Sequence, residues 1–379
     1  MSYLDSTLEK IEVRQVRVPY PDVPLIIDDW TLAFLIGFTG QTLWYLVKHR
    51  ATLYTVSSIP KKTGGRRQIF DPSDLLRRLQ VQLRYHVLRP LVAQLGPHVT
   101  AYQLNKSTID AAKAHIRECA VCDATTRPNT QNVSHPCPRQ GSKFKLDLKN
   151  FFLSTRRSWV RQYFHQVVGY NHYASSLLGQ LLTTTYVDVR GRRQDGVPPG
   201  SLTAGDICNL VADWKLDTAL RTALPEWTYT RYADDLYFSH EKKLSPGAVR
   251  AAITKAANTI EASGYRVNWK KVQQQPWEKP QRLLGVNINR KMSIPANEYA
   301  RMHNLLYHIH KYGFEARLAR TKKASTLQLH GWIQGKLNYF KRISPEQTQK
   351  LEKLYHKATL AHPLSLHMEP SPAWSPPPQ

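Results

Sequence analysis

The sequence predicts an α+β fold in which a small antiparallel sheet is backed by helices. Two stretches, 143–148 and 228–239, are rich in β-forming residues and read as strands, the second of them as a hairpin. Other stretches, such as Leu75 to Leu88, carry apolar residues at helical spacing. With 379 residues, of which 41% are apolar, the chain is long enough for two or three domains with a sizeable core.

The predicted hairpin carries two adjacent carboxylates, Asp234 and Asp235, at its tip. Burying unpaired charge costs several kcal/mol, so a divalent cation is a natural neutraliser, and Mg2+ prefers such oxygen ligands. Asp147, near the end of the strand at 143–148, offers a third carboxylate. Two metals held there would activate an attacking hydroxyl and stabilise a pyrophosphate leaving group. An acidic turn in water is the alternative, because Asp is common in turns.

The charge balance favours a phosphate-rich partner. There are 53 Lys and Arg residues against 28 Asp and Glu, which leaves a net charge of +25. Such an excess attracts nucleic acid by steering and counterion release. The basic residues form clusters at Lys61-Lys62, Arg66-Arg67, Arg190 to Arg193 and Lys322-Lys323. Because they are spread along the whole chain, we expect a channel rather than a basic tail, although any one cluster could be a solvated surface.

Cysteine content and the amino terminus bear on the compartment. Four cysteines are too few and too unevenly spaced for a disulfide scaffold, which favours a reducing cytosol. The first residues lack a basic region followed by an apolar core, so no secretory signal is expected. The most apolar stretch, Trp30 to Val47, is shorter than a membrane span and reads as buried helix. We therefore expect a cytoplasmic protein without membrane contact.

The amino-terminal third should contain helices and one basic hairpin. Residues 1–22 read as a lead-in segment, and Asp28 or Asp29 can cap a helix at Trp30. Gly64-Gly65 lies between two short extended segments within 57–72, a pattern typical of a hairpin turn. This hairpin would be a mobile basic flap able to clamp a triphosphate.

Residues 119–141 are rich in Cys, Asn, Thr and Pro and read as an exposed insertion. Within it, Cys119, Cys122, His135 and Cys137 are a candidate tetrahedral zinc site. Only the CxxC half has a standard spacing, so unliganded loop cysteines are the alternative.

The rest of the chain continues this mixed pattern. The expected elements are a Gly/Pro loop at 196–205, a helix from Asp206 to Asp217, a helix at 245–264, strands at 267–272 and 282–289, and basic helices from 296 to 356. A Pro-rich tail at 370–378 reads as disordered.

Taken in order, these motifs resemble the bacterial reverse transcriptases of the retron and phage-defence group. The resemblance covers roughly residues 30–356 and rests on an ordered set of motifs rather than on one tetrapeptide. The set is Ile59 to Ile69, Asp71 to Gln80, Leu146 to Phe152, Asn209-Leu210, Tyr232 to Asp235, Leu284-Gly285 and Gly331-Trp332. Ser201 to Gly205 and Arg282 to Gly285 differ from the usual retron motifs, which favours a defence enzyme outside the retrons.

The resemblance implies a right-hand polymerase fold with fingers, an antiparallel palm backed by helices, and a helical thumb. The implied boundaries are 1–142 for the amino-terminal segment and fingers with the insertion at about 119–141, 143–294 for the palm with a returning fingers segment at about 156–195, 295–358 for the thumb, and 359–379 for the tail.

The resemblance also implies roles for single residues. Asp147, Asp234 and Asp235 would be catalytic and hold two Mg2+ ions, which Mn2+ can replace. Phe152 would stand against the sugar 2′ position and select deoxynucleotides, a core Phe being the alternative. The remaining implied residues are Lys62, Arg67 and Gly200 for dNTP binding, Asn209 for packing against template and nucleotide, and Lys270 or Lys271 as general acid.

The implied function is RNA-directed DNA synthesis on a bound noncoding RNA, in anti-phage defence. The implied partners are the template RNA, the DNA product and dNTPs, with an effector or second polymerase subunit as a further candidate. Template-independent or protein-primed synthesis is the first alternative. A catalytically inactive RNA-binding scaffold is the second, although such a scaffold would need none of the three carboxylates.

Overall fold

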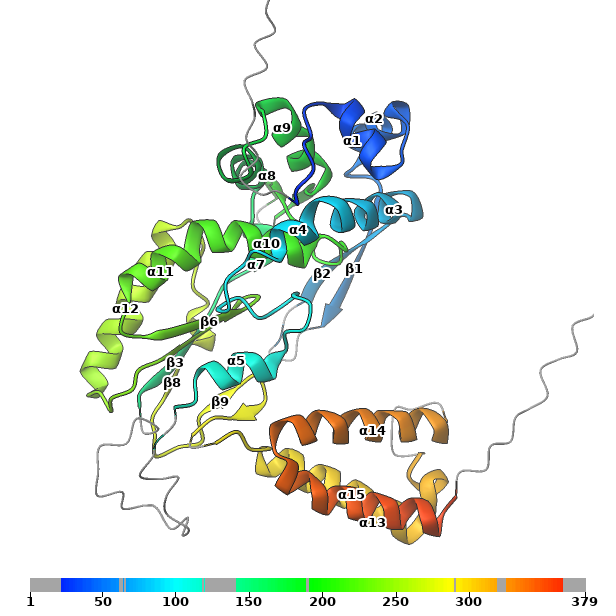
Figure 1. Cartoon of the computed structure of the whole chain (residues 1–379), viewed down its shortest axis with the longest axis vertical. Coiled ribbons are helices and arrows are strands. Elements are labelled where there is room, and N and C mark those ends of the chain that lie inside the picture. Colours follow the sequence, from blue (N-terminus) through cyan, green and yellow to red (C-terminus); the bar gives the residue numbers. More distant parts are fainter. Residues whose placement is uncertain are drawn as a thin grey trace, which may run out of the picture. The chain divides into compact units, whose positions relative to one another are not determined.

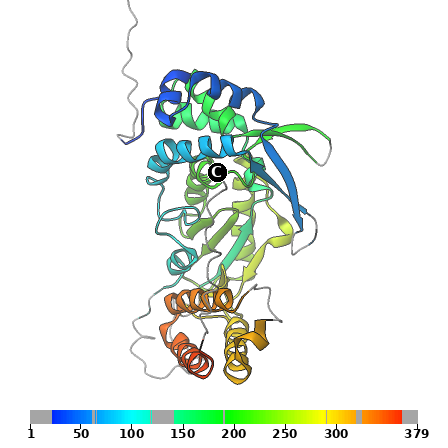
Figure 2. The same ribbon diagram turned by 90° about the vertical axis from the view of Figure 1, so that its right-hand side faces the viewer.

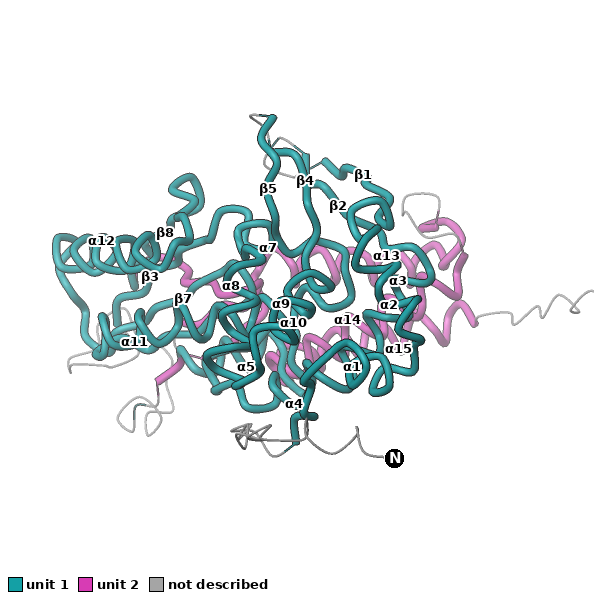
Figure 3. Tube along the Cα trace, turned by 90° about the horizontal axis from the view of Figure 1, so that it is seen from above, with its two compact units in different colours: residues 1–115, 119–277 teal, residues 116–118, 278–379 magenta. Residues whose placement is uncertain are grey.

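The chain divides into two compact units in the computed structural model (Figure 3). Unit 1 comprises residues 1–115 and 119–277, and unit 2 comprises 116–118 and 278–379. The structure describes residues 22–60, 64, 66–117, 119, 141–188, 191–289, 291–318 and 325–363.

Two short helices open the described part of unit 1, α1 (Asp29–Ile36) and α2 (Gly40–His49). Asp28 caps α1: its Oδ1 accepts from the Thr31 amide at 2.7 Å, and the Thr31 hydroxyl accepts from the Asp28 amide at 3.1 Å. Gly37, at a φ of 68°, ends α1. The apolar run is thus two helices bent by 102°, and no described helix is by itself long and apolar enough to cross a membrane; only this bent pair meets that test.

The predicted basic hairpin is confirmed. Strands β1 (Tyr54–Pro60) and β2 (Arg66–Pro72) pair antiparallel, with Pro60 opposite Arg66 around the predicted turn. A helical segment follows as α3 (Asp74–Leu83), a π-helical turn (Arg84–Leu88) and α4 (Arg89–Val92). Its buried apolar side chains form part of the core, as the helical spacing predicted.

The centre of unit 1 is a four-stranded antiparallel sheet in the order β6-β7-β3-β8 (Figure 1). Its strands are β6 (Thr228–Tyr232), β7 (Asp235–Ser239), β3 (Lys143–Asp147) and β8 (Gln273–Gln275). Side chains alternate between the two faces of each strand. Phe144 and Phe238 stack on the face that forms the core, so Lys145, Asp147 and Asp235 lie on the opposite face.

Helices complete the core on one face of this sheet. They are α10 (Ala204–Ala212), a π-helical segment (Asp213–Asp217), α11 (Thr218–Ala223) and α12 (Pro246–Ala262).

Helix α5 (Thr108–Ala114) is followed by His115, whose ring bonds Thr230 and Ser239 at 2.7 and 2.8 Å. His115 is 2% exposed, so these bonds tie α5 to the two strands of the hairpin.

The remaining elements of unit 1 lie between β3 and α10. They are α7 (Phe151–Ser154), α8 (Arg157–Gln162), a π-helical segment (Tyr163–Val168), α9 (His172–Leu181), β4 (Thr184–Val187) and β5 (Arg193–Gly196). The β4–β5 hairpin extends beside β1–β2 on the same side of the unit (green and blue in Figure 2; Figure 3).

The strand predicted at 267–272 is wrong. Residues Trp269–Lys271 form a 3-10 turn and β8 begins only at Gln273, while Val267 makes a single bridge to Leu148. Val267 and Val272 both pack on the hydrophobic core, although the 3-10 turn between them interrupts any strand.

The described part of unit 2 contains a small hairpin and, after it, long helices, the first of which is kinked at Gly313. Strands β9 (Arg282–Leu283) and β10 (Val286–Asn287) pair across Leu284 and Gly285, whose φ angles are 48° and 86°, so the strand predicted at 282–289 is instead a tight hairpin. The predicted basic helices are confirmed as α13 (Ala296–Leu318), α14 (Thr326–Ile343) and α15 (Pro345–Ala361) (Figure 1).

Candidate active site

A two-residue turn presents the first candidate carboxylate. Tyr232 and Asp235 are paired, so Ala233 and Asp234 form the connection between β6 and β7. Ala233 has a φ of 55°, a left-handed conformation that costs a non-glycine residue roughly 1 kcal/mol or more. The buried Ala233 side chain holds this turn in place and leaves Asp234 partly exposed.

The sheet register brings the three predicted carboxylates together. Asp147 and Asp235 are direct partners across β3 and β7. The amide of Leu148 donates to the Asp234 carbonyl at 2.8 Å, which fixes the turn against the end of β3. Asp147 is 2% exposed, whereas Asp234 and Asp235 are partly exposed. Three residues from two distant parts of the sequence therefore share one end of one sheet face.

The cluster is electrostatically unfavourable for its own charges. Burial, followed by the neighbouring Asp235 and Asp147, raises the pKa of Asp234 above its ordinary value. Burial also raises the pKa of Asp235, with Asp147 contributing and Lys145 opposing. Two carboxyl groups with raised pKa values in one cluster identify a place where added positive charge would be stabilising.

Two lysines and one asparagine contact the cluster. The Nζ of Lys145 lies 2.6 Å from Asp235 Oδ1, and the Nζ of Lys271 lies 2.7 Å from Asp147 Oδ2. Asn268 donates from Nδ2 to Asp147 Oδ1 at 2.8 Å and from its backbone amide to the Asp147 carbonyl at 2.8 Å. The two ammonium groups leave the three carboxylates with one net negative charge. The donor set, all carboxylate oxygen, fits a hard divalent cation such as Mg2+.

The sequence predicted only part of this arrangement. Lys271 was one of two candidate lysines, and the structure separates it from Lys270, which is exposed. Partial burial lowers the pKa of Lys271, but its bond to Asp147 outweighs that effect and the pKa is raised. Lys145 was not predicted, although it lies two residues before Asp147 and so on the same face of the strand. Asn268 gave no sequence signal because its partner is 121 residues away.

An aromatic pair lies beside the cluster. The ring centroids of Phe152 and Tyr102 are 6.2 Å apart. Burial raises the pKa of Tyr102, and the charge of Asp234 raises it further while Arg67 opposes the shift. Tyr102 is therefore within the electrostatic reach of both the carboxylates and the basic hairpin. It was missed because a single Tyr in a loop carries no pattern, and only its φ of 56° marks it in the structure.

The Gly/Pro loop meets the basic hairpin at one point. The amide of Phe70 on β2 donates to the Pro199 carbonyl at 2.7 Å. Gly200 has a φ of 111°, and a Cβ there would lie 2.6 Å from the Phe70 carbonyl oxygen, so only glycine fits. Arg67 is exposed on the same strand, while Lys62 lies outside the described residues.

Comparison with known proteins identifies the family. The sequence pattern described as "Reverse transcriptase (RNA-dependent DNA polymerase)" matches residues 59–288, more than half of the chain and including all three carboxylates. The chain belongs to the reverse transcriptase family. The predicted α+β right-hand polymerase fold is thereby confirmed, with the antiparallel sheet as its centre.

Two curated relatives are retron reverse transcriptases from Myxococcus xanthus. The Mx65 enzyme is 27% identical over 317 residues, which are 80% of this chain and 64% of that protein. The Mx162 enzyme is 27% identical over 280 residues, which are 68% of this chain and 52% of that protein. The chain thus spans about half to two thirds of the relatives' lengths.

Two solved telomerase structures are also similar to this reverse transcriptase. The Candida albicans telomerase, in complex with a fragment of telomeric RNA, matches at a TM-score of 0.44 and 10% identity over 81% of this chain and 63% of that one. The apo telomerase of Candida tropicalis matches at 0.41 and 14% identity over 68% of this chain and 61% of that one.

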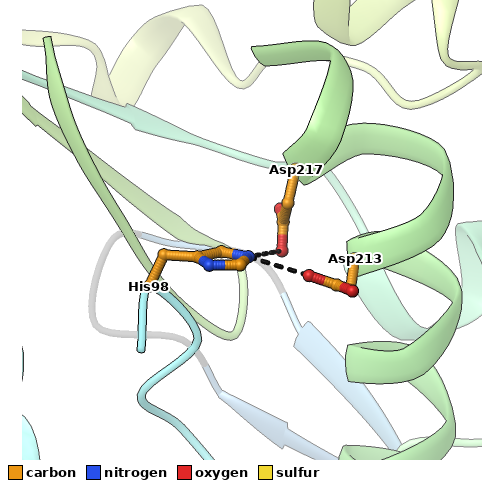
Figure 4. A group of neighbouring side chains, drawn as sticks. All are labelled: His98, Asp213 and Asp217. Atoms are coloured by element: carbon orange, nitrogen blue, oxygen red, sulfur yellow. Dashed lines mark hydrogen bonds and ion pairs between the residues drawn. The ribbon is translucent and has the colours of Figure 1, made fainter. Parts of the chain in front are cut away.

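A second acidic cluster of this reverse transcriptase lies on the core face of the hairpin (Figure 4). His98 Nε2 lies 2.8 Å from Asp213 and 3.5 Å from Asp217. Arg231, fully buried on β6, donates to both oxygens of Asp217 at 2.8 to 3.0 Å, and the Tyr229 hydroxyl donates to one of them at 2.8 Å. Because Asp217 and its partner Arg231 are both fully buried and their charges are paired, this cluster is an ion-pair network of the core.

Asn209 belongs to this network instead of packing against template or nucleotide. It is fully buried, donates to the Ala101 carbonyl at 2.7 Å and accepts from Arg231 Nη1 at 2.7 Å. The prediction for Asn209 is therefore corrected: its contacts are with the protein, and they hold the strand that precedes the carboxylate turn.

The zinc prediction lies almost wholly outside the described residues. Cys119 is buried, while Cys122, His135 and Cys137 fall in the part of the chain that the structure does not describe.

Proposed function

We propose that the chain is an RNA-directed DNA polymerase that copies a bound RNA into DNA. The observation that carries this proposal is the meeting of Asp147, Asp234 and Asp235 at one end of the sheet, within the region that matches the reverse transcriptase family. Three carboxylates face two lysines there, which leaves a net negative charge that a bound cation would neutralise.

The three carboxylates would hold two Mg2+ ions. When bound, such ions activate the primer hydroxyl and stabilise charge on the departing pyrophosphate. The protein supplies the oxygen ligands and fixes them by backbone pairing rather than by flexible loops. Lys145 and Lys271 occupy two of these carboxylates, and we propose that they balance charge when metal is absent.

Other side chains would place the nucleotide. Arg67 and Lys62 would bind the triphosphate, for which the planar Arg fork is well suited. Gly200 would let the Gly/Pro loop approach β2 closely, and Phe152 would exclude a sugar 2′ hydroxyl. Lys271, kept protonated by Asp147, holds a proton at Nζ and is the better placed of the two lysines to act as general acid.

Further parts of the proposal concern partners and domains. The net charge of +25 supports a large bound RNA, and the retron names of the relatives support a noncoding one. We also propose a role in phage defence, residues 1–142 and 143–294 as fingers and palm, and the helices of 295–358 as the thumb. Untemplated or protein-primed synthesis is the competing proposal.

The test is to purify the protein from its native host, sequence the copurifying RNA and DNA, and repeat this with Asp234→Asn. RNA-directed synthesis predicts one discrete RNA and complementary DNA that is absent from the variant. DNA without a complementary RNA would support untemplated or protein-primed synthesis. RNA without DNA under any condition would support the scaffold and end the polymerase proposal.

The sugar-selection role of Phe152 has its own test. Replacing Phe152 by Ala should raise ribonucleotide incorporation relative to deoxynucleotide by roughly 10- to 200-fold, the range that steric selection in a pocket provides. The measurement is kcat/KM for paired dNTP and rNTP substrates on one primer and template. An unchanged ratio would assign Phe152 to the core.

A further inference from the structure

A basic pocket lies outside the carboxylate site, between the β4–β5 hairpin and the start of α8. Its volume is about 470 Å3. Its charged lining residues are Arg156, Arg157, Arg193 and Asp195, and Ser158 and Thr185 add hydroxyl groups. Thr185 is paired with Asp195, and Arg193 lies two residues before Asp195, so these side chains share one face of the hairpin.

Arg157 lines this pocket, and its side chain is held by hydrogen bonds on two sides. The Nη2 of Arg157 lies 2.6 Å from Asp195 Oδ1, and its Nε donates to the Thr183 hydroxyl at 3.1 Å. The Thr185 hydroxyl donates to the same Asp195 oxygen at 2.7 Å. The single carboxylate of the lining is thus already paired with Arg157. Two positive charges, those of Arg156 and Arg193, remain in excess.

These two arginines are available to a ligand. Arg156 and Arg193 are exposed, and neither makes an ion pair or hydrogen bond that the structure gives for the described part of the chain. The Arg156 guanidinium lies 5.8 Å from the Trp159 ring centre, a contact that orients the side chain but leaves its donors open.

A further cation increases the excess. Burial lowers the pKa of Arg157, and the nearby charge of Arg50 lowers it further, so two guanidinium groups are close enough to repel. The Nε of Arg50 is buried and has no hydrogen-bond partner among the described residues. Asp195 can balance only one of the positive charges gathered here, and the remaining excess favours an anionic ligand.

The pocket is joined to the proposed nucleotide site through the backbone. The Val197 amide, just after β5, donates to the Thr155 carbonyl at 3.1 Å. A Cβ at Gly196 would lie 2.3 Å from the Leu153 carbonyl oxygen, so the end of β5 packs directly on α7. Because α7 also carries Phe152, a ligand in the pocket would be held at a fixed offset from the nucleotide site.

We propose that this pocket binds backbone phosphates of the enzyme's RNA and so anchors the RNA away from the carboxylate cluster. Phosphate oxygens match the planar donors of arginine, and the exposed Ser158 hydroxyl can add a hydrogen bond. The inference rests on the proposed function, because that function supplies an RNA partner. Its ligand is the sequence-independent part of the RNA, so the pocket fixes position rather than sequence.

The experiment compares two double variants of the full chain, Arg156→Gln/Arg193→Gln and the charge-matched control Arg221→Gln/Arg250→Gln. Arg221 and Arg250 are exposed on α11 and α12. Binding of a fluorescein-labelled RNA hairpin with a single-stranded extension is followed by anisotropy between about 50 and 200 mM KCl. Thermal melting checks that all proteins are folded.

The pocket variant should bind the RNA several-fold more weakly, and its plot of log affinity against log salt should be shallower by roughly 1 to 2, as loss of two phosphate contacts predicts. Arg156→Lys/Arg193→Lys, which keeps the charges, should retain most of the slope. A pocket variant whose affinity and slope equal those of the control would overturn the proposal. So would an effect seen with a DNA hairpin of the same sequence but not with the RNA.

Extension of oligo(dT) on saturating poly(rA) in Mg2+ separates this test from the proposed function. The pocket variant should keep the wild-type kcat on saturating poly(rA), because the carboxylate site is intact, while its KM for poly(rA) should rise several-fold. Wild-type protein that extends no primer would count against the polymerase, while the anisotropy comparison would still decide whether the pocket binds RNA.

Discussion

Two acidic clusters lie at the two faces of the β6–β7 hairpin, and the pKa values of their carboxyl groups are shifted in opposite directions. On the core face, Asp217 is fully buried and accepts from Arg231, with Tyr229 and His98 close by. Burial acts to raise the pKa of Asp217, but Arg231 and His98 outweigh it and the pKa is lowered. On the open face, Asp234 and Asp235 have raised pKa values.

The difference separates a structural charge from one that we propose to be catalytic. A buried structural carboxylate is stable in its charged form only when enough hydrogen-bond donors and positive charges contact it. The open cluster keeps an excess of carboxylate that nothing in the described chain neutralises in full, and the fold tolerates the cost because Arg231 and Asn209 hold β6 from the other side. The charges that stabilise the fold and those that we propose to be catalytic therefore lie on opposite faces of the same strands.

The largest expected effect is on activity at the open face. Asp234→Asn should reduce nucleotide incorporation by roughly a thousandfold or more, because a proposed ligand of the catalytic metal ions is lost. Its free energy of unfolding should stay the same or rise, since the ionised form is disfavoured there. Primer extension and urea unfolding of the same preparations measure both. A marked loss of stability would place Asp234 with the structural charges.

The next largest effect is on stability at the core face. Asp217→Asn should lower the free energy of unfolding by about 3 to 5 kcal/mol, because Arg231 would be left buried without a charge partner. Nucleotide incorporation should fall only in step with the unfolded fraction. Urea denaturation followed by circular dichroism measures this. A variant as stable as the wild type would show that Arg231 is held mainly by Asn209.

A smaller effect should follow when the open face loses a cation. Lys145→Met removes the partner of Asp235 and should strengthen Mg2+ binding several-fold, since carboxylate charge is then less compensated. The readout is the Mg2+ concentration that gives half of the maximal rise in melting temperature. Lys242→Met, at an exposed position, is the matched control. Equal midpoints in the two variants would show that Lys145 does not compete with metal.

The smallest expected effect concerns pH. Burial acts to lower the pKa of His98, but Asp213 and Asp217 outweigh it, so the pKa is raised. A group with a raised folded pKa stabilises the protein fully below its ordinary pKa and loses that contribution as pH rises through the folded value. The free energy of unfolding should therefore fall by about 1 kcal/mol from pH 6.5 upward. In His98→Gln this decline should be absent; its persistence would assign the pH dependence to other groups.

Local patterns predicted much of this molecule. The hairpin at 228–239, the basic hairpin around Gly64, the helical spacing after Asp74 and the helices from 296 all depend on residues close in sequence, and the structure confirms them. Only the family resemblance predicted that Asp147 lies beside the hairpin, because no single segment of the sequence determines the order of the strands.

What could not be predicted depends on long-range contacts. Asn268 lies at the cluster because of how the turn after Val267 is placed. Tyr102 reaches Phe152 through a left-handed loop residue without any periodic signal. Asn209 was assigned to the template side by the family resemblance alone, and its partner Arg231, 22 residues further on, could not be identified from the helical pattern around it.

The hydrogen bond between Phe70 and Pro199 fixes β2 against the Gly/Pro loop, so the position of Arg67 depends on the number of residues between it and this bond. Ile69 faces Gly200, and Arg67 lies two residues away on the same face of β2. With about 3.4 Å per residue, Arg67 is about 7 Å along the strand from this contact. One residue inserted between Arg67 and Ile69 would turn the arginine to the opposite face while leaving every side chain present. Among relatives of this chain, that spacing should therefore admit substitutions more readily than insertions.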